Sequence, residues 1–139
     1  MPQYRNQFDP GTGAHIDVIV SKPIDIYGEE YAARSETRLH MLIDTGASKT
    51  AIGTKAIQAM NLQPVEKRTV RFATAERSVN LYQIDMTCDI FSPPFYLANI
   101  SVMGFDFVDG WKGGILGRDF LEKIAIEING PEKYFKITV

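Results

Sequence analysis

The residues with the clearest chemical potential lie in the stretch MLIDTGASKT, from Met41 to Thr50, where Asp44 follows a run of apolar residues. Burying a carboxylate at the end of an apolar strand disfavours its charged form unless hydrogen-bond donors or a second carboxylate lie nearby. The small polar residues after Asp44 predict a tight turn, in which the backbone N–H of Gly46 can point back at the carboxylate. From these residues alone, Asp44 is either a reactive carboxylate or the cap of a helix that begins near Ser48.

The segment LIDTGAS at 42–48, together with GGILGRDFL at 113–121, resembles the short retroviral-type branch of the aspartic proteases, the retropepsins. In that family an apolar strand delivers the catalytic aspartate on a D-T/S-G-A turn. A second motif of two apolar residues and a glycine, followed by a helix, packs around that turn. The resemblance spans about residues 14–139. It implies a mainly β, single-domain acid protease fold with a closed, barrel-like β structure and one or two short helices.

Carried over position by position, the resemblance implies a role for each residue of the first motif. Asp44 would be the catalytic carboxylate, the hydroxyl of Thr45 would tie two active-site turns together, and Gly46 would be the backbone donor that holds the carboxylate. Ala47 and Ser48 would flank the backbone of the substrate.

The second motif is expected to support the active-site turn rather than to react. Ile115, Leu116 and Gly117 correspond to the apolar-apolar-Gly support, and Arg118 and Asp119 would open the helix behind it. For Arg118, a structural ion pair or hydrogen bond is favoured over a plain surface position.

A single DTG sequence has a consequence for assembly. Peptide hydrolysis by this chemistry needs two carboxylates, one to take a proton from water and one to protonate the scissile carbonyl. The resemblance therefore implies a two-fold homodimer in which Asp44 faces its symmetry mate. The apolar last strand, KYFKITV, is expected to interleave with strands of the second chain rather than to pair only within its own. Residues 1–13 would form a flexible or dimer-interface arm.

The segment VRFATAERSVNLYQI, between the two motifs, is expected to form a β-hairpin flap over the substrate, with its tip near Ala75 to Ser78. Many retropepsins have glycine at the tip, which gives mobility and close approach to the substrate. This chain has Glu76 and Arg77 there, so a solvent-exposed charged turn without function is the alternative. The candidate substrate-binding residues of the hairpin are Ala73, Thr74, Ala75 and Glu76.

Hydrophobic periodicity predicts mostly short strands in the rest of the chain. The expected elements are strands at 15–20 and 39–44, a loop at 27–38, a helix between Ser48 and Pro64, two strands within 69–90, a strand at 95–104, a short helix after 117, and a terminal hairpin around Asn129 and Gly130.

Length and composition narrow the range of functions. The chain has 139 residues, 45% of them hydrophobic, which suits one domain, residues 1–139, with its own core. A net charge of −2 and a pI near 5.7 give no reason to expect nucleic acid as a partner. Cys88 is the only cysteine, and His15 and His40 have no metal-ligand spacing around them, so we expect no disulfide, metal or other cofactor.

The N-terminal sequence has neither the basic nor the apolar region of a secretory signal, and no apolar run approaches the length of a membrane span. A cytoplasmic location is therefore expected, unless the chain is part of a longer polypeptide. The leading hypothesis is an aspartic endopeptidase that acts on extended peptides. The alternatives are a non-catalytic retropepsin-like module for dimerisation or peptide binding, and an unrelated small β-barrel in which Asp44 caps a helix.

Overall fold

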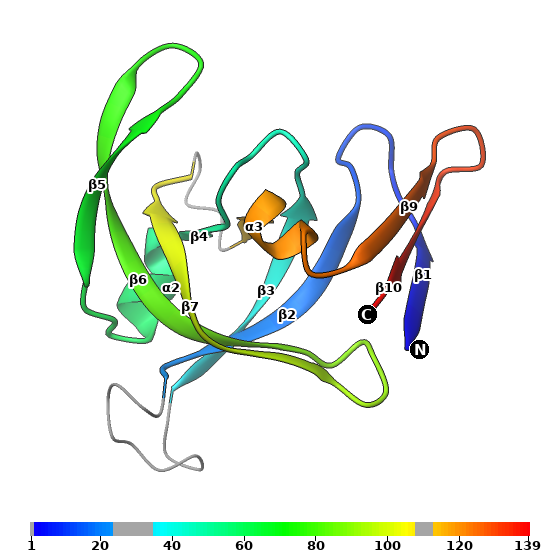
Figure 1. The fold of residues 1–139 in the computed structure, drawn as a ribbon, viewed down its shortest axis with the longest axis horizontal. Helices are drawn as coiled ribbons and strands as arrows, with labels where there is room; N and C mark the ends of the chain where they lie inside the picture. The colour runs from blue at the N-terminus through cyan, green and yellow to red at the C-terminus, as the bar shows by residue number, and fades with distance from the viewer. Residues whose placement is uncertain (1, 24–34, 108–112) are drawn as a thin grey trace.

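The computed structural model describes residues 2–23, 35–107 and 113–139, and most of these residues lie in β-strands (Figure 1). The strands are β1 (Gln3–Gln7), β2 (His15–Ser21), β3 (Glu36–Ile43), β4 (Ala51–Gly53), β5 (Glu66–Arg71), β6 (Glu76–Cys88), β7 (Phe95–Phe105), β8 (Gly114–Leu116), β9 (Ala125–Asn129) and β10 (Tyr134–Thr138). The helices are α2 (Thr54–Ala59) and α3 (Arg118–Leu121).

Six of these strands close into a barrel. The larger sheet has the order β2-β3-β8-β4-β7-β6-β5, and an additional pairing of β2 with β6 closes the first six of these strands into a ring. Strand β5 stays outside the ring and pairs only with β6. Two neighbouring pairs, β3 with β8 and β4 with β7, are parallel. Because β3 and β8 run in the same direction, the residues that follow Ile43 and Leu116 leave the barrel side by side.

The barrel interior is filled by every second residue of its strands, as the alternation of HIDVIV predicted. In β2, Ile16, Val18 and Val20 are buried, and the facing strand β3 buries Leu39 and Met41. Strand β3 begins at Glu36, so the end of the loop predicted at 27–38 is wrong, and residues 27–34 lie outside the described part of the chain. The antiparallel pairing of β2 with β3 covers residues 36–38 and draws them into the sheet.

The helix predicted from Ser48 is shorter than expected, because its first part is a strand. Ala51 and Ile52 are buried between β7 and β8 and pair with both. Helix α2 begins only at Thr54, after Gly53. The apolar residues of β4 have a spacing that fits a helix as well as a strand. They form a strand because β4 pairs with two neighbouring strands.

The tip of the β5–β6 hairpin lies N-terminal to the predicted position. Glu76 and Arg77 belong to β6, where they pair with Arg71 and Val70 of β5. The turn that connects the strands runs from Phe72 to Ala75 and is closed by a hydrogen bond of 2.8 Å between the Phe72 N–H and the Ala75 carbonyl. The expectation that Glu76 and Arg77 form the tip is therefore wrong.

The two ends of the chain form a second sheet with the order β1-β10-β9. Its central strand, β10, buries Phe135 and Ile137 against the main core. The hairpin predicted around Asn129 and Gly130 is confirmed. In the single chain, β1 and β9 occupy both edges of β10 (Figure 1), and the expected interleaving of the last strand with a second chain stays a prediction. Residues 3–7 form a strand that pairs with β10, and the expected dimer-interface role of residues 1–13 stays a prediction.

Candidate functional site

Asp44 lies where β3 leaves the barrel, and its backbone is fixed there by β8. Its N–H donates a hydrogen bond of 3.0 Å to the carbonyl of Leu116, and its own carbonyl accepts one of 3.2 Å from the N–H of Ala47. The Gly46 N–H donates to the carboxylate Oδ1 at 2.9 Å, which is the contact that the spacing predicted. The other carboxylate oxygen accepts no hydrogen bond from the described residues. Asp44 is half-buried, so this oxygen is available to water, a substrate or a second carboxylate.

The second motif packs directly beneath the turn. A side chain at Gly117 would place its Cβ 2.6 Å from the carbonyl carbon of Lys49, a distance that atoms do not tolerate. Glycine therefore allows the junction of β8 and α3 to lie against the backbone that follows Asp44.

Arg118 joins the two motifs through hydrogen bonds. Its guanidinium Nη1 donates to the carbonyl of Thr45 at 3.0 Å, and its backbone N–H donates to the carbonyl of Ala47 at 2.8 Å. The side chain thus makes a structural hydrogen bond to the turn, although it is itself exposed.

A buried polar cluster completes this support, and the sequence analysis missed its centre, Thr50. The Thr50 hydroxyl donates to Asp119 Oδ1 at 2.7 Å and accepts from the Gly117 N–H at 3.1 Å. The same oxygen of Asp119 also accepts the N–H groups of Thr50 at 2.9 Å and of Phe120 at 2.8 Å. The sequence gives only two weak signals of this cluster. Thr50 precedes an apolar pair, and Asp119 is an acidic residue in the first turn of a helix.

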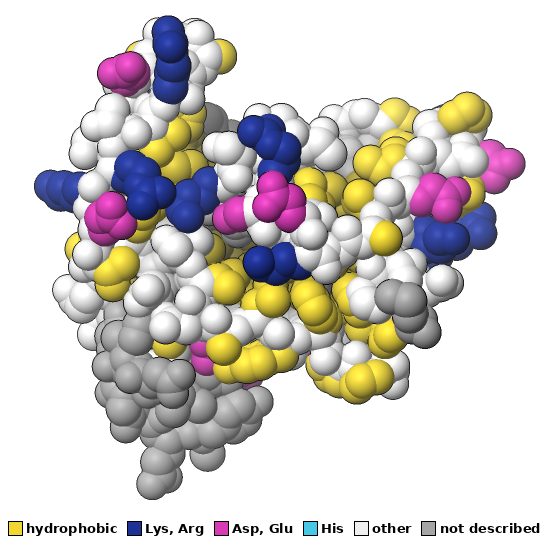
Figure 2. Space-filling view, viewed as in Figure 1, with side chains coloured by type: hydrophobic (Ala, Val, Ile, Leu, Met, Phe, Trp, Pro, Cys, Tyr) yellow, Lys and Arg dark blue, Asp and Glu magenta, His cyan; other side chains and the backbone are white. Residues whose placement is uncertain are grey.

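A cavity of about 660 Å³ lies between the Asp44 turn and the β5–β6 hairpin. Figure 2 shows apolar side chains in the hollow between this hairpin, at the upper left, and the body of the molecule. Of the residues predicted for the site, those that line the cavity are Asp44, Gly46, Ala47, Ser48, Ala73 and Ile115. Those that do not line it are Thr45, Thr74, Ala75, Glu76, Leu116, Gly117 and Arg118.

Much of the cavity wall comes from residues that the sequence analysis did not select. Strand β5 and the hairpin turn contribute Arg68, Thr69, Val70, Arg71 and Phe72, and other elements contribute Lys49, Ala51, Met103 and Phe105. The ring centroids of Phe72 and Phe105 lie 5.6 Å apart, so the hairpin turn packs against β7. A strand running antiparallel to β6 was predictable from the alternation around Phe72, but its position beside Asp44 was not.

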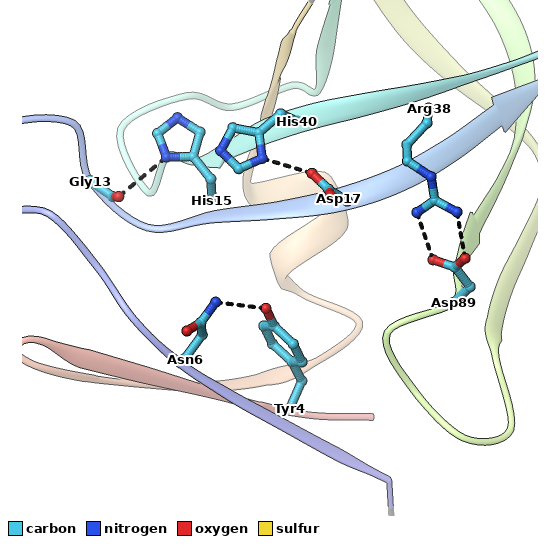
Figure 3. A network of polar contacts seen from close by, with 8 residues as sticks. All are labelled: Tyr4, Asn6, Gly13, His15, Asp17, Arg38, His40 and Asp89. Carbon is cyan, nitrogen blue, oxygen red and sulfur yellow. Dashed lines mark hydrogen bonds and ion pairs between the residues drawn. The ribbon is translucent and has the colours of Figure 1, made fainter.

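Another polar cluster on the barrel lies on the outer side of β2 and β3 (Figure 3). The rings of His15 and His40 stack with centroids 4.6 Å apart, His15 Nδ1 donates to the Gly13 carbonyl at 3.2 Å, and His40 Nδ1 bonds Asp17 Oδ1 at 2.7 Å. Burial lowers the pKa of His15. Nowhere in residues 2–23, 35–107 and 113–139 do three histidine, cysteine or acidic side chains converge in a way that could hold a metal ion. Of the helices described, none has the length and apolar character of a membrane span.

Both the sequence and the fold of this chain are similar to those of known aspartic proteases. The sequence model of a family described as gag-polyprotein putative aspartyl protease matches residues 34–123, more than half of the chain. A crystal structure of a retropepsin-like aspartic protease from Rickettsia conorii superposes with a TM-score of 0.61 at 12% identity, covering 97% of this chain and 89% of that chain. The EIAV protease in complex with an inhibitor gives a TM-score of 0.57 at 14% identity, covering 85% and 93%. No curated protein matches the sequence significantly.

The similarity to the two solved structures shows a retropepsin-like fold, as the two motifs predicted. The alternative of an unrelated barrel with Asp44 as a helix cap is wrong. Helices α2 and α3 follow Gly53 and Gly117, and neither begins at the Asp44 turn.

Proposed function

Because the chain belongs to the gag-polyprotein putative aspartyl protease family, we propose that it is an aspartic endopeptidase whose reactive carboxylate is Asp44. One observation carries the proposal. The Asp44 carboxylate stands at the end of a buried strand, with one oxygen held by Gly46 and the other open, at the wall of a cavity with room for an extended peptide. A cavity of about 660 Å³ falls within the range of about 300–1,000 Å³ typical of ligand sites.

The second carboxylate comes from a second copy of the chain. Asp44 is the only acidic residue among the described residues that line the cavity, and this chemistry requires a general base and a general acid together. Thr45 and Gly46 are exposed in the single chain and are accessible to a symmetry mate. In the isologous dimer the Thr45 hydroxyl ties the two turns together, and the two Asp44 carboxylates share a proton and titrate as a pair.

In the proposed reaction, one Asp44 takes a proton from water, which attacks the scissile carbonyl, while its protonated mate donates to the carbonyl oxygen. Ala47 and Ser48 flank the substrate backbone beside the carboxylates. The hairpin turn covers the substrate from above, with Ala73 at the cavity wall. Ile115, Leu116, Gly117 and Arg118 hold the turn from below, Arg118 through its hydrogen bond to the Thr45 carbonyl.

The test is cleavage of a peptide library by the purified protein, with Asp44→Asn as the key variant. We expect Asp44→Asn to lose about 10²–10⁴-fold in rate or more, because general acid–base catalysis contributes that much. Asp17→Asn is the matched control, since Asp17 is an exposed carboxylate on the outer side of the barrel. Cleavage that survives Asp44→Asn would overturn the assignment. A protein that stays monomeric in sedimentation at concentrations where it cleaves would overturn the pairing of two Asp44 carboxylates.

A second candidate function is a non-catalytic module that binds an extended peptide in the same cavity. The observation in its favour is the hairpin turn, which has no glycine and is anchored by the packing of Phe72 on Phe105. Binding of a statine-type transition-state mimic separates the two functions. The protease should bind it, and Asp44→Asn should not, whereas a module without catalysis should show no affinity that depends on Asp44.

A further inference from the structure

The wall of the cavity has an excess of positive over negative side chains, although the whole chain has a negative net charge. Three cationic residues line it, Lys49 from the Asp44 turn and Arg68 and Arg71 from β5, against the single carboxylate of Asp44. The whole chain has a net charge of −2, so this excess is local. Figure 2 shows dark blue side chains gathered around the apolar hollow beside the hairpin.

Two of these three cations have no ion-pair partner among the described residues. Only Arg68 has an ion-pair partner among the described residues, Glu66, at 3.3 Å, and both side chains are about half exposed. Arg71 lies opposite Glu76 in the β5–β6 ladder, yet the two side chains form no ion pair. Lys49 likewise has no ion-pair partner in the described part of the chain. The positive potential of the cavity is therefore available to a ligand.

The floor of the same cavity is apolar. Val70, Phe72, Met103 and Phe105 contribute to it, and Val70, Phe72 and Phe105 pack against a small core cluster that includes Met103. A peptide that fills the cavity would therefore place apolar side chains on this floor and other side chains against the cationic residues. Charge complementarity at such a surface gives specificity rather than large affinity.

We infer that the cavity selects peptides with an acidic side chain, Asp or Glu, beside the apolar residues that occupy its floor. Lys49 and Arg71 bind the acidic group. This inference rests on the proposed function, because it names the substrate class of that same site. Lys49 and Arg71 act in substrate recognition and not in the proton transfers.

The test uses the full-length protein and an octapeptide library in which one position at a time is Glu or its neutral isostere Gln. At one or more positions we expect kcat/KM to be up to about fivefold higher for Glu, because that is the most that an exposed ion pair usually contributes. The preference should shrink between low and high salt, where solvent-exposed charges are screened. It should lie in KM rather than in kcat if the acidic group binds equally well in the ground and transition states.

The double variant Lys49→Glu with Arg71→Glu should bring the preference to within about twofold or reverse it. Lys67→Glu is the matched control, because Lys67 is an exposed cation on the same strand that does not line the cavity. It should keep the wild-type preference. The neutral double variant, Lys49→Gln with Arg71→Gln, serves if the charge reversal prevents folding. Equal rates for Glu and Gln peptides at every position in the wild type would overturn the inference.

Binding by Asp44→Asn separates this inference from the proposed function. The dissociation constants of fluorescein-labelled Glu and Gln peptides for this variant measure ligand preference without catalysis. If no cleavage depends on Asp44 but the Glu peptides bind more tightly, the proposed function fails and the ligand class stands. If cleavage depends on Asp44 while Glu and Gln peptides bind and react alike, the ligand class fails alone.

Discussion

Replacement of Thr50 by valine tests the buried support beneath the Asp44 turn. Valine keeps the shape of threonine but removes a hydroxyl that donates to Asp119 at 2.7 Å and accepts from the Gly117 N–H at 3.1 Å. Thr50 is only 1% exposed, so water cannot replace these partners. A hydrogen bond to a carboxylate contributes about 1.5–3 kcal/mol, and a buried N–H without an acceptor costs about 1–3 kcal/mol. Because Asp119 keeps its backbone donors from Thr50 and Phe120, we expect a loss of about 2–4 kcal/mol in the free energy of unfolding.

The measurement is urea unfolding followed by circular dichroism. Protein concentration must be held fixed, because the stability of the proposed dimer would depend on it. Thr54→Val is the matched control, since the Thr54 hydroxyl bonds to Asp106 at 3.0 Å on the exposed surface and should change stability by less than about 0.5 kcal/mol. Thr50→Ser, which keeps the hydroxyl, should recover most of the loss.

Two results would refute the reasoning. A Thr50→Val variant as stable as Thr54→Val would mean that the hydroxyl contributes nothing to the support. A Thr50→Ser variant as unstable as Thr50→Val would show that keeping the hydroxyl does not preserve stability, so the hydrogen bonds would not account for the loss.

Three further predictions follow from local geometry and titration. Gly117→Ala should lower the free energy of unfolding in urea by about 1–3 kcal/mol, because the new Cβ would lie 2.6 Å from a backbone carbon. Gly130→Ala, which has open space around the new Cβ, should be nearly neutral. Equal losses for the two variants would contradict the packing argument. Burial raises the pKa of Cys88 to about 12, so iodoacetamide at pH 8 should alkylate it in urea but not in the folded protein, and rapid native alkylation would show that it is accessible. The same raised pKa contributes stability below the ordinary value of 9.0 that is lost as the pH rises toward 12, which alkaline denaturation measures. The bidentate hydrogen bond from Arg38 lowers the pKa of Asp89, so Asp89→Asn should lower stability slightly at pH 7. The difference in stability from wild type should vanish as the pH falls below the ordinary pKa of 3.8 and the wild-type carboxylate is protonated. A difference that persists in acid would contradict this.

The barrel strands and the Asp44 turn were predictable because their signals are local. The alternation of Ile16, Val18 and Val20 identifies a strand with one buried face, whatever its neighbours. The hydrogen bond from Gly46 to Asp44 spans only two residues, so the turn sequence is enough to predict it. The order of an apolar strand, a glycine and a short helix from Ile115 onward is equally local.

Elements that depend on distant partners were harder to predict. Ala51 and Ile52 have helical spacing with Ala56 and Ile57, yet they form a strand because β7 and β8 offer unpaired edges on both sides. Thr50 was missed for the same reason, since the partners of its hydroxyl lie 67 and 69 residues away along the chain. No pattern within one segment reports such contacts.

The position of the hairpin turn shows how a small error along the chain changes the chemistry of the site. A tip at 75–78 would bring Glu76 and Arg77 toward the substrate together, and their charges would offset each other. The observed turn at 72–75 instead places Glu76 in β6, outside the cavity wall, while Arg71 and Phe72 line it. The register of β5 against β6 therefore determines which hairpin charges join Lys49 beside Asp44. With a tip at 75–78, Lys49 would lie beside a Glu76 and an Arg77 whose charges offset each other, and the expected preference for acidic peptides would be weaker.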